Sequence, residues 1–108
     1  MAKSFDFNNV KKQNMIVTLA DENKTKLLVG LPTKEVFERL VDLETNFDES
    51  NVEVIENLYE IVSDILNCNK NKIHISKDMV KETMDYEDII YFIRAYGEFI
   101  QEIVNSKN

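Results

Sequence analysis

The chain has 108 residues, the length of a single domain, because domains cluster at about 100–150 residues. Its 20 aspartates and glutamates outnumber 13 lysines and arginines, which gives a formal charge of −7. This balance argues against nucleic acid as a direct ligand, because phosphate backbones bind clustered cations. Hydrophobic residues make up 44% of the chain, enough for a core and too many for a disordered acidic tail.

The rare residue types exclude further classes. Two glycines and one proline argue against a glycine-rich phosphate-binding loop and against a many-turned β-sandwich. The single cysteine, Cys68, has no partner for an internal disulfide or for a cysteine zinc site, which favours a reducing cytoplasm. Residues 1–10 lack the apolar run of a signal peptide, and no stretch approaches the roughly 18 apolar residues of a membrane span. We therefore expect a cytoplasmic protein without membrane contact.

The N-terminal third of the chain predicts an arm and a β-hairpin. Residues 1–14 are polar around Phe5 and Phe7, and we expect them to be mobile unless they dock. Met15–Ala20 and Thr25–Gly30 are β-branched and apolar on either side of a polar turn, which is typical of a hairpin. A two-stranded hairpin is marginal in water, so it must pack against helices or pair with another chain.

Two helices follow the hairpin. Thr33 is suited to cap a helix that begins near Lys34, and the apolar periodicity ends near Glu44. After a polar loop, apolar residues recur every three or four positions and predict a second helix over Val52–Leu66. Asparagines at 67, 69 and 71 are suited to end it.

The region after the second helix is less uniform. Lys72–Ile75 is compatible with a short strand, a bridge back to the hairpin or an extended connector, and the sequence leaves these alternatives open. Ser76 is suited to cap a short helix that contains Met79 and Val80. Asp85 is suited to cap a long final helix from Tyr86 to about Asn105.

The final helix carries a broad apolar stripe. At about 100° per residue, eight side chains fall within an arc of about 140°. We expect it to be the central element of a compact bundle of about three to four helices, in a mainly α (α+β) single domain, residues 1–108, with a small N-terminal hairpin. Ile90 and Tyr91 lie outside the stripe and face either another element or a partner. The stripe consists of Ile89, Phe92, Ile93, Tyr96, Phe99, Ile100, Ile103 and Val104.

The residues with catalytic potential form no motif. His74 is the only histidine and lies between two isoleucines, which is typical of a structural position. Cys68 has no second cysteine for a redox cycle, and nothing marks a carboxylate as held in an apolar cleft. Asp42–Glu53 lacks the central glycine of a calcium-binding EF-hand loop. We therefore predict no enzyme, no catalytic residue, no metal site and no cofactor.

Apolar residues beyond the needs of the core suggest a binding role. A small acidic protein with an open apolar face can hold apolar segments of a partner while its charge keeps the complex in solution. Phe47 lies in a polar loop and Tyr91 lies opposite the stripe, so neither has an obvious intramolecular role. The candidate partner-binding residues are Phe47, Ile90, Tyr91 and Phe92.

The order of these features resembles the tail assembly chaperones of tailed phages (siphophages) of Gram-positive bacteria and their prophages. The resemblance rests on the Phe5-Asp6-Phe7 arm, the hairpin, the helix after Leu31-Pro32-Thr33, the helix that ends in Ile65–Lys70, and the aromatic final helix. It implies a small, non-enzymatic, helical protein of the host cytoplasm that binds the tape measure protein and keeps it soluble. It also implies recruitment of tail tube protein subunits and absence from the finished virion.

An alternative function is an acidic inhibitor or antitoxin-like regulator that occupies a basic protein surface. Its binding would collapse with salt, because charge attraction is screened within about 8–10 Å at physiological ionic strength. Binding through apolar contacts would tolerate salt better. We also expect weak homo-oligomers, because an open apolar stripe on one copy can be covered by another.

Overall fold

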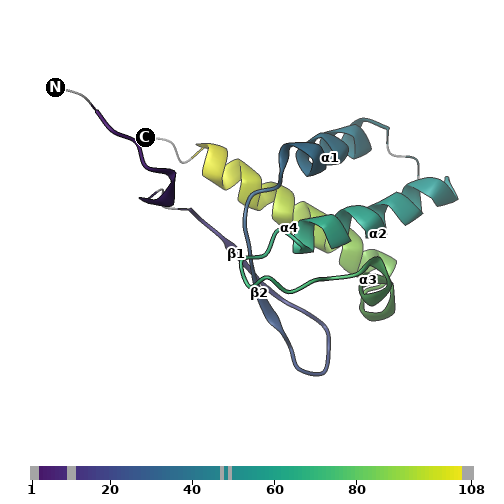
Figure 1. Ribbon diagram of the computed structural model, residues 1–108. Helices are drawn as coiled ribbons and strands as arrows, with labels where there is room; N and C mark the ends of the chain where they lie inside the picture. The colour runs from purple at the N-terminus through teal and green to yellow at the C-terminus, as the bar shows by residue number, and fades with distance from the viewer. Residues whose placement is uncertain (1–2, 10–11, 47, 49, 106–108) are drawn as a thin grey trace.

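Helices dominate the computed structural model, which describes residues 3–9, 12–46, 48 and 50–105 (Figure 1). Within these residues the chain forms a hairpin of β1 (Met15–Thr18) and β2 (Lys26–Val29), then α1 (Lys34–Asn46), α2 (Val52–Leu66), α3 (Lys77–Thr83) and α4 (Tyr86–Asn105). The predicted fold class, mainly α with a small N-terminal hairpin, is confirmed.

The hairpin packs one face on the helices. Its strands are antiparallel, with Met15 opposite Val29 and Thr18 opposite Lys26. Leu27 and Val29 of β2 are fully buried, and β2 packs against α2. In the turn, the Asp21 carboxylate accepts hydrogen bonds from the hydroxyl (2.6 Å) and the N–H (2.9 Å) of one residue, Thr25. These bonds lower the pKa of Asp21.

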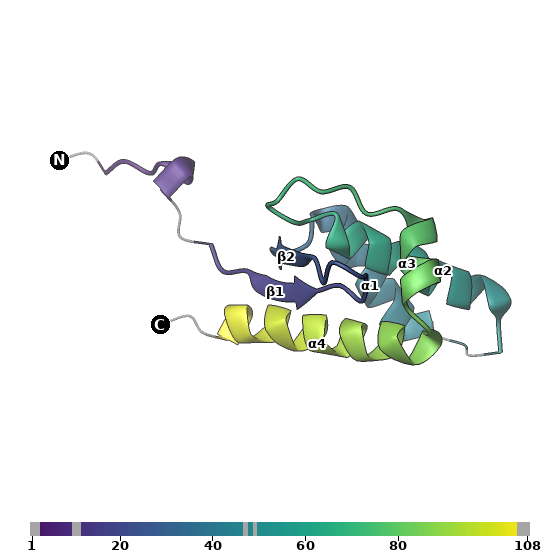
Figure 2. The ribbon, with the colours of Figure 1, turned by 90° about the horizontal axis from the view of Figure 1, so that it is seen from below.

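Helix α2, rather than α4, is the central element. It packs against α1, α3, α4 and β2, and six of its residues are buried, whereas only Ile89 and Tyr96 are buried in α4. Figure 2 shows that α4 runs along one side of the molecule, and most of its stripe residues are only partly buried. The expectation that the aromatic final helix is the centre of the bundle is therefore wrong, although its predicted bounds agree with α4.

Helix starts are fixed by side chains that accept from free N–H groups. Ser76 accepts from the N–H of Met79 and caps α3. Asp85 accepts from the N–H of Asp88 (2.9 Å), and the Asp88 carboxylate accepts from the N–H of Asp85 (3.1 Å), a reciprocal cap of α4. The predicted caps at Ser76 and Asp85 are thus confirmed.

The asparagine-rich segment after α2 docks on the outer edge of β2. Asn69 forms a β-bridge with Val29, and the Asn71 side chain accepts from the N–H of Leu28 (2.8 Å). Asn67 both accepts from and donates to the backbone of Ile75 (2.7 and 2.8 Å). Lys72–Ile75 is therefore a connector outside the sheet, with Lys72 in the left-handed region (φ 58°), and the bridge to the hairpin forms earlier, at Asn69.

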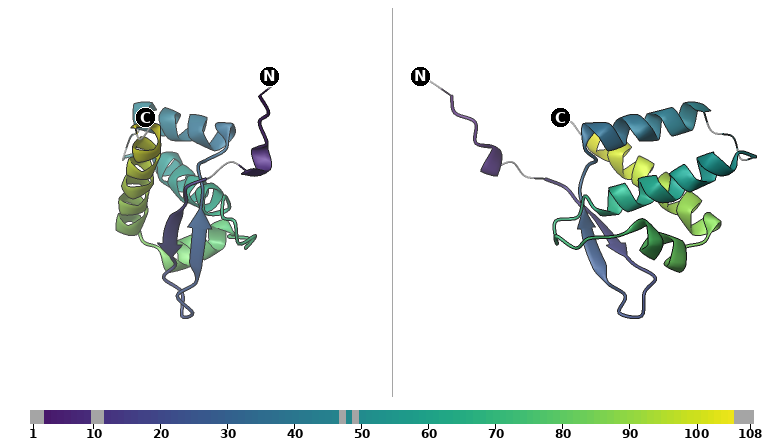
Figure 3. Two further views of the ribbon diagram at one scale, coloured as in Figure 1. Left: turned by 90° about the vertical axis from the view of Figure 1, so that its left-hand side faces the viewer. Right: turned by 45° about the vertical axis from the view of Figure 1, so that its right-hand side comes forward.

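The N-terminal arm stands away from the helices in all views (Figures 1–3). Phe7–Asn9 forms a single turn of 3-10 helix. The rings of Phe5 and Phe7 meet edge to face, with centroids 4.8 Å apart, and both are exposed to solvent.

Candidate functional site

A concave surface lies between α1 and α4. Two hollows of about 880 and 320 Å³ adjoin there and share Leu43, Gly97 and Gln101 among their lining residues. We treat them as one feature, the α1–α4 groove. It is lined by Phe37, Leu40, Val41, Leu43 and Glu44 of α1, Leu58 of α2, and Ile90, Ile93, Arg94, Gly97, Glu98, Ile100, Gln101, Glu102, Val104 and Asn105 of α4.

The floor of the groove is apolar and only partly covered. Phe37 and Val41 lie one helical turn apart on α1 and remain 45% and 47% exposed. Opposite them, Ile93 and Ile100 of α4 are half-buried. These side chains form an apolar strip that the monomer leaves accessible to solvent.

Gly97 keeps the centre of the groove open. It is the glycine of α4 and lines both hollows. A Cβ atom built at this position meets no atom within 4 Å. The space beside residue 97 is therefore unfilled because this residue has no side chain.

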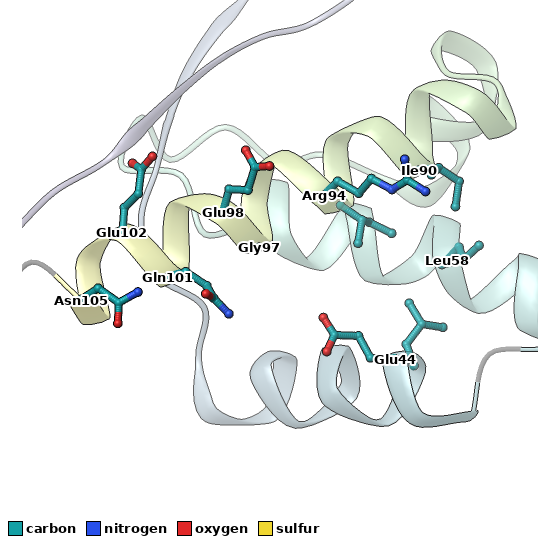
Figure 4. A pocket seen from close by; sticks show the side chains of 11 residues that line it. Glu44, Leu58, Ile90, Arg94, Gly97, Glu98, Gln101, Glu102 and Asn105 are labelled. Atoms are coloured by element: carbon teal, nitrogen blue, oxygen red, sulfur yellow. The ribbon is translucent and has the colours of Figure 1, made fainter.

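The rim of the groove is charged and mostly negative. Figure 4 shows Glu44 and Gln101 projecting into the gap, with Glu98 and Glu102 on the outer side of α4. Arg94 is the cation among the lining residues. Among the described residues, neither Arg94 nor these three glutamates form an ion pair, so their charges are available to a bound partner.

Other charged groups hold the helices together. Arg39 of α1 pairs with Glu60 (3.1 Å) and Asp64 of α2. Glu56 of α2 pairs with two lysines of α3, Lys81 (2.8 Å) and Lys77 (3.2 Å). Hydrogen bonds from these lysines, Lys81 first, lower the pKa of Glu56. These ion pairs join α1 to α2 and α2 to α3 and therefore have a structural role, whereas the charged residues at the rim of the groove form no such pairs among the described residues.

The structure distributes the candidate partner-binding residues over different surfaces. Ile90 is half-buried and lines the groove. Tyr91 is 60% exposed and does not line it, and Phe92 stacks on Tyr96 with ring centroids 6.0 Å apart. Successive helical residues point about 100° apart, so these three share no single face. Phe47 lies outside the described residues.

Sequence reasoning missed the residues that form the groove. Apolar periodicity alone places Phe37 and Val41 among the apolar positions of their helix and does not reveal that they stay exposed, and the sequence reasoning did not consider Gly97. A glycine inside a long helical pattern costs stability and usually has a packing or functional reason, so Gly97 was the available signal.

Tyr96 ties α4 to the end of the hairpin. Its hydroxyl donates to the carbonyl of Gly30 (2.8 Å), and its ring is fully buried. Burial raises the pKa of Tyr96 far above its ordinary value, and the electrostatic interaction with Cys68 contributes less. The phenol therefore stays protonated and acts as a structural donor.

The residues with catalytic potential are dispersed. Cys68 is half-buried, and its thiol lies 3.5 Å from the carbonyl of Asp64, while His74 is exposed. Within the described ranges, no group of three or more histidines, cysteines and carboxylates is placed to hold a metal ion. The α1–α4 groove, rather than these dispersed residues, is therefore the candidate site.

None of the helices in the described chain has both the length and the apolar character needed to cross a membrane.

Comparison with known proteins assigns no family to this chain. No family model, no curated protein and no solved structure matches it.

Proposed function

We propose that this protein is a tail assembly chaperone of a siphophage or prophage of Gram-positive bacteria, and that it holds helices of the tape measure protein in the α1–α4 groove. It acts in the host cytoplasm, keeps the tape measure protein soluble, helps to recruit tail tube protein and does not enter the virion. The observation that carries this proposal is the open apolar floor of the groove between charged rims.

The dimensions of the groove suit a short amphipathic helix. Its α4 wall runs from Ile90 to Asn105, which corresponds to about 22 Å at about 1.5 Å per residue. A helix of about four turns covers this length and presents anchors at every third or fourth position. The exposed strip of Phe37 and Val41 gives such anchors a surface to contact.

The expected affinity is modest, as transient holding requires. Three or four buried apolar side chains contribute about 1.5–3 kcal/mol each. Association costs at least about 4 kcal/mol in lost translational and rotational freedom, and ordering the interface adds to this. The net binding free energy corresponds to micromolar or weaker dissociation constants per helix. A client with many helices engages many copies, each of which is released as tube subunits assemble.

The first test is co-expression of the full chain with the long helical protein encoded nearby. We expect the soluble fraction of the client to rise with the chaperone present. In Val41→Gln the groove loses an exposed apolar anchor, so client solubility falls. Tyr91→Gln removes a similarly exposed apolar residue outside the groove and serves as the matched control. A client that remains equally insoluble with and without the chain contradicts the proposal.

Salt separates this proposal from an acidic inhibitor or antitoxin-like regulator. Apolar contacts in the groove predict client capture that changes little with ionic strength. Capture that collapses at high salt favours the alternative instead, because attraction between exposed charges is screened beyond about 8–10 Å.

A further inference from the structure

Strand β1 has an unpaired edge. The described sheet contains only β1 and β2, and the outer edge of β2 is already covered by the asparagine-rich segment. The N–H of Gly30 donates to Cys68 and the carbonyl of Leu28 accepts from Lys70. Among the described residues, the edge of β1 that faces away from β2 makes no backbone hydrogen bond to another segment.

The strand register identifies the backbone groups on this free edge. Leu19 donates to Thr25 across the hairpin, while Leu28 bonds outward to the asparagine-rich segment. Hydrogen-bonded and non-hydrogen-bonded pairs alternate in an antiparallel ladder. Val17 therefore exchanges bonds with Leu27, and the N–H and C=O groups of Ile16 and Thr18 point to the free edge.

This edge lacks the usual protection against pairing. Natural edge strands are blunted by lysine, proline or a bulge. Met15–Ala20 contains no charged residue and no proline, and Ile16 is 67% exposed on the outer face of the hairpin.

An apolar platform lies beside the edge. Helix α4 runs next to β1 in two perpendicular views (Figures 2 and 3). In α4, Phe92 stacks on Tyr96 and Phe99 contacts Tyr96 at a tilt, and both phenylalanines are only half-buried. A further strand beside β1 would extend the sheet on the side where α4 lies.

We propose that two copies of this chain pair through their β1 strands, antiparallel and around a two-fold axis at Val17. In this register Ile16 exchanges backbone hydrogen bonds with Thr18 of the partner subunit, and the hairpins merge into a four-stranded sheet. The occupant is a second copy because the edge is self-complementary: each free donor meets an acceptor, and no charges oppose each other at the axis. This inference is independent of the α1–α4 groove and of the proposed client.

The dimer is weak and is strengthened by salt. The paired segment is four residues long, which gives an interface well below the roughly 1,200 Å² of stable complexes. Each copy carries a formal charge of −7, so the copies repel each other at low ionic strength. Screening this repulsion raises the association constant, whereas it weakens contacts between opposite charges.

Analytical ultracentrifugation of the full chain over a concentration series tests the pairing. We expect the average molar mass of the wild type to rise from that of a monomer towards that of a dimer as the concentration increases. Added salt should move this rise to lower concentration. Ile16→Pro removes an edge N–H that β2 does not use and is expected to remain monomeric. Ile16→Thr keeps this N–H and is expected to dimerise within a few-fold of the wild type. A wild type that stays monomeric throughout, an Ile16→Pro variant that dimerises normally, or an Ile16→Thr variant that fails to dimerise overturns the proposal.

Disulfide trapping tests the register without relying on the proline variant. In a Cys68→Ser background, Val17→Cys places two thiols opposite each other at the axis, where Cα atoms of a non-hydrogen-bonded pair lie about 4.5 Å apart. Ile16→Cys places its thiol opposite Thr18 of the partner subunit instead and is the matched control. We expect Val17→Cys to form covalent dimers several-fold faster on oxidation. Equal rates for the two variants exclude this register and overturn the proposal.

Discussion

Replacing Gly97 is expected to raise the stability of the fold, and a replacement as large as leucine is expected to weaken client capture as well. Glycine in a helix interior costs about 0.5–1 kcal/mol relative to alanine, because it loses more backbone freedom on folding. Since a Cβ at residue 97 meets no atom within 4 Å, Gly97→Ala recovers this energy without a steric penalty. Unfolding entropy of about 2.1 cal/mol/K per residue over 108 residues converts about 1 kcal/mol into a rise of about 4 °C in Tm.

Larger side chains at residue 97 extend into the groove. Gly97→Leu retains most of the gain in helix propensity and covers part of Ile93 and Ile100, so its Tm is expected to equal or exceed that of Gly97→Ala. The leucine occupies the space that a client helix needs. We therefore expect client solubility to fall from wild type to Gly97→Leu, while Gly97→Ala, which adds only a methyl group, stays near the wild type.

Thermal unfolding by circular dichroism and the co-expression assay measure the two quantities on the same variants. Because Gly97→Leu is predicted to be more stable than the wild type, a loss of capture cannot be attributed to unfolding. A Gly97→Leu variant that keeps full client capture shows that the groove is not the client site. A drop in Tm for Gly97→Ala refutes the open space assigned to residue 97.

Three further predictions concern the fold. Tyr96→Phe removes the donor to Gly30 and should lower stability by about 1–2 kcal/mol in urea unfolding. The pKa of Tyr96 is higher in the folded chain than its ordinary value of 10.0, so above pH 10 the unfolded chain loses this proton more readily than the folded one. Wild-type stability should therefore fall by up to about 1.4 kcal/mol per pH unit above pH 10, and Tyr96→Phe should lack this contribution. Asn67→Ala leaves the N–H of Ile75 without its acceptor, while the carbonyl of Ile75 keeps the bond from the Ser63 hydroxyl, so the variant should cost about 1–3 kcal/mol, and Asn67→Asp, which keeps the acceptor, should cost less. The pKa of Glu56 is lower in the folded chain than its ordinary value of 4.5, so the ionised carboxylate stabilises the fold above pH 4.5 and this stabilisation is lost as the pH falls. The Tm of Glu56→Gln should therefore fall less on acidification than the Tm of the wild type.

Helix bounds were predictable where periodicity and caps agree. The apolar pattern gave Val52–Leu66 for α2, and the structure has the same bounds, with Asn51 as the N-cap. The predicted bounds of α4 also agree, because Asp85 caps it and its stripe continues to the end. The first helix was predicted to end near Glu44 and extends to Asn46, since helix ends depend on single hydrogen bonds that periodicity does not encode.

Tertiary placement was not predictable from the stripe of a single helix. Amphipathicity shows that a helix has a buried side, but not how many neighbours cover it. Both α2 and α4 carry an apolar stripe, yet α2 lies at the centre with six buried residues, whereas only Ile89 and Tyr96 of α4 are buried. The asparagines after α2 were predicted to end a helix, and they also bond to β2 and to the Ile75 backbone over distances that local rules do not describe.

The groove forms because α1 and α4 both pack on α2 and leave a gap between them. This gap is lined by Phe37 and Val41 on one side and by Gly97 on the other. One substitution, Gly97→Leu, is expected to occupy part of the gap, cover some of its apolar surface and strengthen the helix together. A chain selected for monomer stability alone has no reason to keep a glycine there, since proteins accept such costs mainly where a site needs the space. The unfilled groove is therefore better explained as a binding surface than as imperfect packing.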